Sequence, residues 1–170
     1  YRTVYDYFRE GFWIRVRYPV IGHDVRIRYM PRYESSGNAD AVRVILEYYD
    51  IKEDFVVVQG DNVFRFNLEE AYRLHVERKA FMTVALKPVE DVSGFGVAKL
   101  SSDGRIEYFV EKPEPSRAPS NLANTGIYII SPSIREFFNS DIGQKMVLRG
   151  EMDFGSHVIP KLIELGYPVY

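Results

Sequence analysis

The chain has 170 residues, of which 46% are apolar and 15% aromatic, a composition that suits one well-packed globular domain and argues against disorder. Its 22 basic and 24 acidic side chains nearly balance, so the sequence predicts no general attraction to nucleic acid or to an anionic membrane. The absence of cysteine excludes disulfides, thiol catalysis and cysteine-based zinc sites, and the three scattered histidines show no metal-ligand spacing.

The first 36 residues predict a helix followed by extended segments. Apolar residues at helical spacing between Val4 and Phe8 indicate an amphipathic helix that Gly11 would end. Apolar and basic residues alternate over residues 12–20, which predicts a short strand or an extended arm, and again over residues 25–30, which predicts a strand with one wetter face. The arginines of that face could meet phosphate, although an alternating strand usually carries such charges simply as its solvated side, which is the favoured interpretation.

A helix is predicted to begin at Asn38, after a short polar loop over residues 34–37. Asn38 is a candidate cap, Asp40 is favourable in the first turn, and apolar residues follow at helical spacing through Leu46. The loop offers free amide donors, and Gly37 has no Cβ, so a planar base or a phosphate could approach the backbone closely. The same residue types also cap helices that bind no ligand, so both interpretations stay open.

The segment F-V-V-V-Q-G-D-N-V-F at residues 55–64 is the most informative stretch. Its unbroken apolar run predicts a central parallel strand covered on both faces. Ligands of open α/β sheets bind beyond the carboxyl ends of the strands, where Asp61 would follow Gly60 into a crevice. A carboxylate there could hold Mg²⁺, which prefers oxygen ligands. Gly-Asp-Asn is also ordinary turn chemistry, so a plain turn remains the alternative.

The next segments predict a strand, a helix and a strand. Asn67 and Glu70 have the spacing of a capping box that opens a helix, and residues 81–87 form an apolar run at the distance expected of a β-α-β unit. No G-x-G-x-x-G opens a helix, so a dinucleotide site loses its main support.

An Asp-Gly turn at residues 103–104 joins two extended runs, which predicts a hairpin. The second run ends in Glu111-Lys112-Pro113. The carboxylate could accept hydrogen bonds from sugar hydroxyls while the ammonium pairs with a phosphate, or both could be charges at a solvated strand end.

The last third predicts an apolar strand at residues 127–130, a short helix from residue 131 to Phe138, and a final helix over residues 156–165 that has Pro160 near its first turn. Residues 141–152 give no clear pattern. Residues 167–170 resemble the opening of a strand, and the chain starts at Tyr1 without methionine, so we expect a piece of a longer domain.

Six short motifs occur in a fixed order: G-N-A-D-A at 37–41, V-V-Q-G-D-N at 57–62, G-F-G-V at 94–97, F-V-E-K-P at 109–113, N-T-G-I-Y at 124–128 and D-F-G-S-H-V-I-P at 153–160. Together they resemble the sugar-1-phosphate nucleotidylyltransferases, which include glucose-1-phosphate thymidylyl-, uridylyl- and adenylyltransferases and mannose-1-phosphate guanylyltransferases. The resemblance implies an α/β fold with a Rossmann-like mixed, mostly parallel sheet of the nucleotide-diphosphosugar transferase type. Residues 1–170 would then form part of a single nucleotidyltransferase domain.

For the nucleotide, the resemblance implies that Gly37 and Asn38 lie at the base and that Gly60 and Asp61 lie near the phosphates. Asp61 would hold Mg²⁺ between the nucleotide phosphates and the incoming sugar phosphate.

For the sugar phosphate, the resemblance implies a binding site of five residues. Gly96 would give the sugar room, Glu111 and Asn124 would bind its hydroxyls, Lys112 would pair with its phosphate, and Tyr128 would line the same pocket.

The implied reaction is attack by an oxygen of a sugar 1-phosphate on the α-phosphorus of a nucleoside triphosphate, with release of pyrophosphate. Such transfers depend on positioning and charge neutralisation, which suits Asp61 and Lys112 as the catalytic pair without a protein nucleophile. The family's glycine-rich loop, G-G-x-G-x-R followed by a lysine, would precede Tyr1. Its second metal-binding aspartate, in a W-x-D-x-G segment, would follow Tyr170, so we expect the chain alone to be inactive.

Two other functional classes stay open. A catalytically silent relative that serves as a regulatory or scaffold subunit would be expected to have lost its ligands, whereas Asp61, Glu111 and Lys112 are all present. A bare nucleotide-binding module fits the β-α-β pattern but leaves residues 109–113 and 124–128 unexplained.

No apolar run approaches ~18 residues, and the start carries no signal-peptide pattern. We therefore expect a soluble, cytoplasmic protein whose partners are a nucleoside triphosphate and a sugar 1-phosphate, with no nucleic-acid or membrane partner. A homo-oligomer stays open.

Overall fold

The computed structural model describes residues 2–17, 25–30 and 35–170. The chain divides into two units, residues 1–34 and 35–170, and each is described by itself. The interpretation of the whole chain as part of one domain stays a prediction.

The described residues of the first unit form two short helices, α1 (Arg2–Phe8) and α2 (Phe12–Arg17). The predicted helix end is confirmed, because Gly11 has a φ of 87° and donates its N–H to the carbonyl of Phe8 at 3.0 Å. The predicted strands are wrong: residues 12–17 are helical and residues 25–30 have no regular structure. Alternation alone does not make a strand, because an extended segment needs a paired neighbour to satisfy its backbone. The rest of the first predicted strand, residues 18–20, and the loop residue Glu34 lie outside the described residues.

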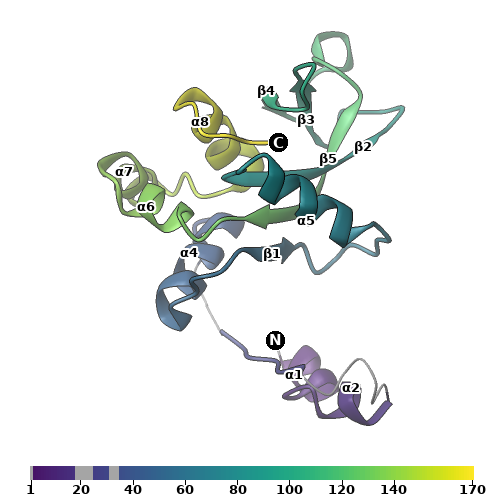
Figure 1. Cartoon of the computed structure of the whole chain (residues 1–170), viewed down its shortest axis with the longest axis vertical. Helices are drawn as coiled ribbons and strands as arrows, with labels where there is room; N and C mark the ends of the chain where they lie inside the picture. Colours follow the sequence, from purple (N-terminus) through teal and green to yellow (C-terminus); the bar gives the residue numbers. More distant parts are fainter. Residues whose placement is uncertain (1, 18–24, 31–34) are drawn as a thin grey trace. The chain divides into compact units, whose positions relative to one another are not determined.

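The second unit contains the remaining elements (Figure 1). Its strands are β1 (Phe55–Val58), β2 (Met82–Pro88), β3 (Gly96–Leu100), β4 (Ile106–Glu111) and β5 (Leu122–Ile130). Its helices are α4 (Asn38–Tyr49), α5 (Leu68–Glu77), α6 (Ile134–Asn139), α7 (Asp141–Arg149) and α8 (Ile159–Glu164), with a 3₁₀ turn η1 (Pro115–Arg117) and a π-helical turn η2 (Phe154–Val158).

β5 is the central strand of the sheet (Figure 1). It pairs antiparallel with β1 along one edge and with β2 along the other. β3 also pairs with β5, at Leu122 and Ala123. Because β2 already pairs with these two residues along its own edge of β5, β3 must lie along the edge that β1 occupies. β4 pairs antiparallel with β3 and completes the predicted hairpin.

The mixed α/β character is confirmed, but the prediction of a mostly parallel sheet is wrong for the described strands. All strand pairs are antiparallel, and the one parallel bridge of this part of the chain joins Met82 to Val169. β1 and β2 run in the same direction, as a β-α-β unit requires, yet β5 lies between them. The sequence could not reveal this insertion, because β5 follows β1 by more than 60 residues.

The prediction that residues 55–58 form a central strand buried on both faces is also wrong. β1 pairs only with β5 among the described residues, and Val56 and Val58 are 42% and 39% exposed. An apolar run indicates that a strand can be buried, but it does not identify the segments that would pack on its two faces.

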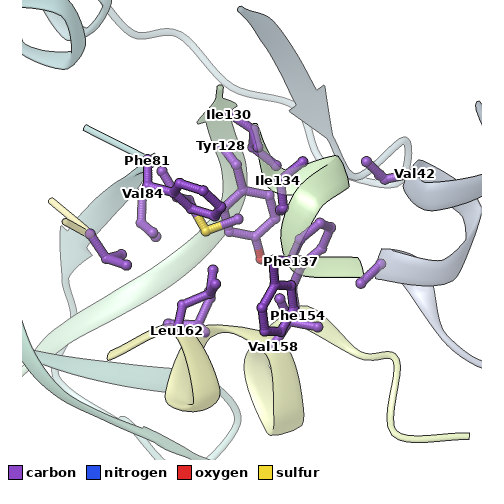
Figure 2. Close-up of a cluster of buried hydrophobic side chains, with 14 of the residues drawn as sticks. Val42, Phe81, Val84, Tyr128, Ile130, Ile134, Phe137, Phe154, Val158 and Leu162 are labelled. Atoms are coloured by element: carbon purple, nitrogen blue, oxygen red, sulfur yellow. The ribbon is translucent and has the colours of Figure 1, made fainter. Parts of the chain in front are cut away.

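The core forms where β5 meets the C-terminal helices. Tyr128 and Ile130 pack with Phe137 of α6, Phe154 of η2 and Leu162 of α8 (Figure 2). The rings of Tyr128 and Phe154 have centroids 4.9 Å apart. Burying each such side chain contributes about 1.5–3 kcal/mol, so this cluster fixes η2 against β5.

Local signals predicted several helices correctly. At the start of α5 the Asn67 side chain accepts the Glu70 N–H at 3.1 Å, as the predicted cap requires. The short helix and the final helix are present as α6 and α8, with Pro160 in the first turn of α8. Helix α7 lies in the segment that gave no clear pattern, and its Ser140 cap is the signal that the sequence offered.

Candidate functional site

A polar pocket of about 290 Å³ lies where the ends of several elements converge. It is lined by Asn38, Gln59, Gly94, Phe95, Gly96, Glu111, Lys112, Asn124, Gly126, Tyr128, Asp153 and Gly155. Six of the predicted site residues lie there: Asn38, Gly96, Glu111, Lys112, Asn124 and Tyr128.

Strand pairing explains why distant motifs meet at this pocket. Gly96 is the register partner of Glu111 in the β3–β4 hairpin. The residue after β1, Gln59, donates its backbone N–H to the carbonyl of Gly126 at 3.1 Å, which fixes the end of β1 against β5. The pocket is therefore a product of long-range pairing.

Glu111 lies half-buried between two glycines. An added Cβ would lie 2.7 Å from Glu111 Oε2 at Gly96 and 2.4 Å from the same atom at Gly155, so a side chain at either position would displace this carboxylate. Burial raises the pKa of the Glu111 carboxyl, the charge of Asp153 raises this pKa further, and Lys112 lowers it. Glu111 therefore places a partly buried carboxylate, which accepts hydrogen bonds when ionised, at the pocket.

Tyr128 and Asn124 form a hydrogen-bonded pair on β5. The Asn124 amide donates to the Tyr128 hydroxyl at 2.9 Å, and its carbonyl oxygen accepts the Gly126 N–H at 3.0 Å. Burial raises the pKa of Tyr128 to about 12, an effect that the Asn124 hydrogen bond opposes and that Asp153 and Glu111 reinforce. The phenol therefore stays neutral at physiological pH.

Lys112 stands at the end of β4 in an uncommon backbone conformation. Its φ is 46°, and its N–H donates to the carbonyl of Phe95 at 2.9 Å. This bend is consistent with the break expected at Pro113, and the exposed Lys112 lines the same pocket as Glu111. Two adjacent charges of opposite sign thus share one pocket, as the interpretation of this motif required.

Gly37 and Asn38 run against the segment that leads into η2. The Asn38 side chain accepts the Phe154 N–H at 2.8 Å instead of capping its own helix, whose cap residue is Gly37. A Cβ at Gly37 would lie 2.2 Å from the carbonyl oxygen of Met152, and the φ of 136° also favours glycine. The structure thus gives Gly37 a packing role outside the pocket lining, and its role at a base stays a prediction.

Gly60 and Asp61 form the turn after β1 and do not line the pocket. The turn is held by the Asn62 amide, which donates to the carbonyl of Thr125 at 3.1 Å. Asp61 is exposed, two residues beyond the pocket residue Gln59. The plain-turn interpretation is therefore correct for the backbone, and binding by the carboxylate stays a prediction.

The described residues contain no cluster of three or more side chains suited to a metal ion. Mg²⁺ is commonly bound through one or two carboxylates plus substrate phosphates and does not require an all-protein cage. The single exposed carboxylate of Asp61 fits that mode of binding.

A sequence model of the nucleotidyl transferase family matches residues 7–170. The chain belongs to this family. Among its relatives, the UTP–glucose-1-phosphate uridylyltransferase of Synechocystis sp. is 35% identical over 170 residues, which cover 97% of this chain and 41% of the relative. A glucose-1-phosphate adenylyltransferase of Clostridium novyi is 32% identical over 140 residues, which cover 79% of this chain and 35% of the relative. The chain thus spans less than half the length of these two relatives.

A solved structure has a similar fold. It is named as a glucose-1-phosphate thymidylyltransferase from Bacillus anthracis in complex with sucrose, and it matches with a TM-score of 0.76 at 23% identity, over 99% of this chain and 62% of that chain. This likeness confirms the predicted nucleotide-sugar transferase fold. Within the described residues of this nucleotidyl transferase chain, no helix has the length and apolar character that a membrane span needs.

Sequence reasoning assigned no role to six pocket residues of this family member: Gln59, Gly94, Phe95, Gly126, Asp153 and Gly155. All six lie inside the motifs, so the signal was present. Asp153 caps η2 by accepting the Ser156 N–H at 2.8 Å, which is the function that its D-F-G-S pattern indicates locally. Its second role, beside Glu111, depends on the tertiary fold.

Proposed function

We propose that the protein containing this chain transfers a nucleoside monophosphate from a nucleoside triphosphate to a sugar 1-phosphate, giving a nucleoside diphosphate sugar and pyrophosphate. One observation carries the proposal: the pocket combines two carboxylates, several amides and one lysine around a space of about 290 Å³. Carboxylates and amides suit the hydroxyls of a sugar, and a lysine suits its phosphate.

Five of the pocket residues would contact the sugar 1-phosphate. Glu111 and Asn124 bind sugar hydroxyls, Gly96 leaves room for the ring, Tyr128 closes one wall, and Lys112 pairs with the sugar phosphate. In the free protein Asn124 already bonds Tyr128 and Gly126, so it would contribute its remaining lone pair and proton.

Nucleotide binding is assigned to Gly37, Asn38, Gly60 and Asp61. An oxygen of the sugar phosphate forms a new bond to the α-phosphorus, and the bond from that phosphorus to the oxygen it shares with the β-phosphate breaks as pyrophosphate leaves. Mg²⁺ held by Asp61 would neutralise charge on the phosphates. The chain's own contribution is to position the sugar phosphate and to keep Lys112 beside it.

A silent regulatory subunit is the competing function. The retention of Glu111 and Lys112 around one pocket favours the enzyme, because a subunit without substrate has no need of them. The base, the sugar, the cytoplasmic location, the homo-oligomer and the membership of residues 1–170 in a single domain stay predictions.

The deciding experiment measures pyrophosphate release by the full-length protein from each nucleoside triphosphate with glucose 1-phosphate, with and without Mg²⁺. We expect release that requires both the sugar phosphate and Mg²⁺. In Asp61→Asn the amide keeps the shape but loses the charge, so turnover should fall to background while the circular dichroism spectrum is unchanged. Asp91→Asn, an exposed carboxylate outside the pocket, is the matched control. Wild-type turnover in Asp61→Asn with unchanged Mg²⁺ dependence would contradict the role of Asp61, and no release with any pair of substrates would favour the silent subunit.

A further inference from the structure

Gln59 is the one amide side chain of the pocket to which neither the motifs nor the proposed reaction assigned a role. It directly follows β1, and its backbone N–H bonds the carbonyl of Gly126, so its position relative to β5 is fixed. The side chain is half-buried and lines the pocket.

The space that the Gln59 side chain fills exists because residue 126 is glycine. A Cβ on Gly126 would lie 2.7 Å from both Cδ and Oε1 of Gln59. Gly126 also has a φ of 73°, a conformation that favours glycine. The amide of Gln59 is therefore packed over the β5 backbone, on the strand that carries Asn124 and Tyr128.

The three amide side chains of the pocket differ in how many hydrogen bonds they already make within the protein. Asn124 bonds Tyr128 through its nitrogen and Gly126 through its oxygen, and the Asn38 oxygen accepts from Phe154. Within residues 35–170, the amide of Gln59 makes no hydrogen bond, and its polar atoms are not sealed from solvent. Its donor and its acceptor are thus both open to a ligand.

This pairing of donor and acceptor distinguishes Gln59 from the charged groups around it. The carboxylates of Glu111 and Asp153 only accept hydrogen bonds when ionised, and Lys112 only donates. A phosphate oxygen suits the lysine, whereas a sugar hydroxyl, which both donates and accepts, suits an amide. We propose that Gln59 is a specificity-determining residue that hydrogen-bonds one hydroxyl of the sugar 1-phosphate, an inference that rests on the proposed function.

The test is a double-mutant cycle between the protein and the ligand. Glucose 1-phosphate and its 2-, 3-, 4- and 6-deoxy analogues are titrated by calorimetry into the full-length wild type and into Gln59→Met, which keeps the length of the side chain and removes the amide. We expect the variant to bind glucose 1-phosphate about tenfold more weakly. One deoxy analogue should bind equally to both proteins, because the contact is already absent, while the other analogues should show the full loss.

Two controls separate this role from a structural one. Gln144→Met makes the same chemical change on α7, where the exposed Gln144 bonds the carbonyl of Phe138, and it should leave every affinity unchanged. Nucleoside triphosphate binding should not change in Gln59→Met.

Three outcomes would overturn the inference. Equal losses for all analogues, or an equal loss of nucleoside triphosphate affinity, would remove Gln59 from the sugar site while leaving the proposed function in place. Failure of the wild type to bind any of these sugar phosphates would overturn the proposed function and this inference with it.

Discussion

Lys112 combines a cationic side chain at the pocket with a backbone φ of 46°. A non-glycine residue in this conformation costs roughly 1–2 kcal/mol, so the surrounding structure must hold it there. The Lys112 N–H bond to Phe95 and the Gly96–Glu111 pairing beside it do so. Such strain is common at ligand sites, and here it occurs at a lysine that lines the pocket.

Lys112→Ala should weaken binding of a sugar 1-phosphate by about tenfold to a hundredfold, since a charge-assisted contact is lost. Nucleoside triphosphate binding should change much less. Lys79 offers a matched control, because it is also an exposed lysine with a φ of 48° and lies outside the pocket. Lys79→Ala should affect neither ligand. Calorimetry with each ligand separately decides the matter, and equal losses for the two ligands in Lys112→Ala would exclude Lys112 from the sugar-phosphate site.

The Glu111 carboxyl offers a second test at the scale of one residue. Its pKa is raised above 4.5 by burial and then by Asp153, so Asp153→Asn should lower that pKa. The Glu111 contribution to folding stability is present below pH 4.5 and is lost as the pH rises through the native pKa, since the folded state binds the extra proton. The decrease in folding stability as the pH rises through the Glu111 pKa should therefore be smaller in Asp153→Asn.

Carbon-13 NMR titration of the Glu111 carboxyl measures this shift directly. Asp103→Asn, at the turn of the same hairpin, provides the control and should leave the pKa of Glu111 unchanged. A Glu111 pKa that rises or stays constant in Asp153→Asn would show that the two carboxyls do not interact.

At the scale of elements, the sequence predicted best where the signal is local. The cap at Asn67 predicted α5, and the Asp-Gly turn predicted the β3–β4 hairpin, because each depends on residues less than ten positions apart. Helix α2 was missed, since its alternating apolar and basic residues match a strand pattern and only packing decides between the two.

Helix α5 contributes a buried histidine to its contact with the sheet. His75 is 3% exposed, its Nδ1 lies 2.8 Å from the Thr83 hydroxyl of β2, and its Nε2 lies 3.9 Å from an Asp54 oxygen. Burial lowers the pKa of His75 below 6.5, and the charge of Asp54 opposes this effect. The ring therefore joins α5 to β2 in its neutral form.

The stability of α5 on the sheet should consequently fall in acid. The unfolded state binds a proton at His75 before the folded state does, so stability is intact above pH 6.5 and declines as the pH falls toward the lower native pKa, by up to about 1.4 kcal/mol per pH unit. Urea unfolding between pH 7.5 and pH 5.5 measures the decline. His75→Gln cannot titrate and should show a shallower decline than the wild type. The same slope in both proteins would assign the acid sensitivity to other groups.

At the scale of the whole molecule, the order of six motifs predicted the fold family and six of the twelve pocket residues. It did not predict Gln59, whose role depends on Gly126, a residue more than 60 positions away that leaves space for its side chain. Asp153 was missed for a related reason, because its position beside Glu111 depends on the tertiary fold and its local pattern indicates only a cap. Sequence patterns identify residues that share a motif, whereas contacts between motifs require the assembled sheet.

The relation between the two units yields the last prediction. The helices of the first unit have only seven and six residues, too few to be stable alone in water. Their apolar side chains are largely exposed, among them Tyr7 at 69% and Val16 at 55%, so these two helices bury little apolar surface. We therefore expect residues 1–34 to lose their helices in the same transition as residues 35–170, as membership in one domain requires.

The single tryptophan of the chain, Trp13, makes this measurable. Its fluorescence reports on the first unit, while far-ultraviolet circular dichroism reports mainly on residues 35–170. The two urea unfolding curves should coincide, because a two-state transition gives every probe the same midpoint. Asn67→Ala removes the α5 cap and costs about 1 kcal/mol, so it should move both curves together to lower urea. A Trp13 transition that precedes the other and ignores Asn67→Ala would show that residues 1–34 are a separate unit in solution.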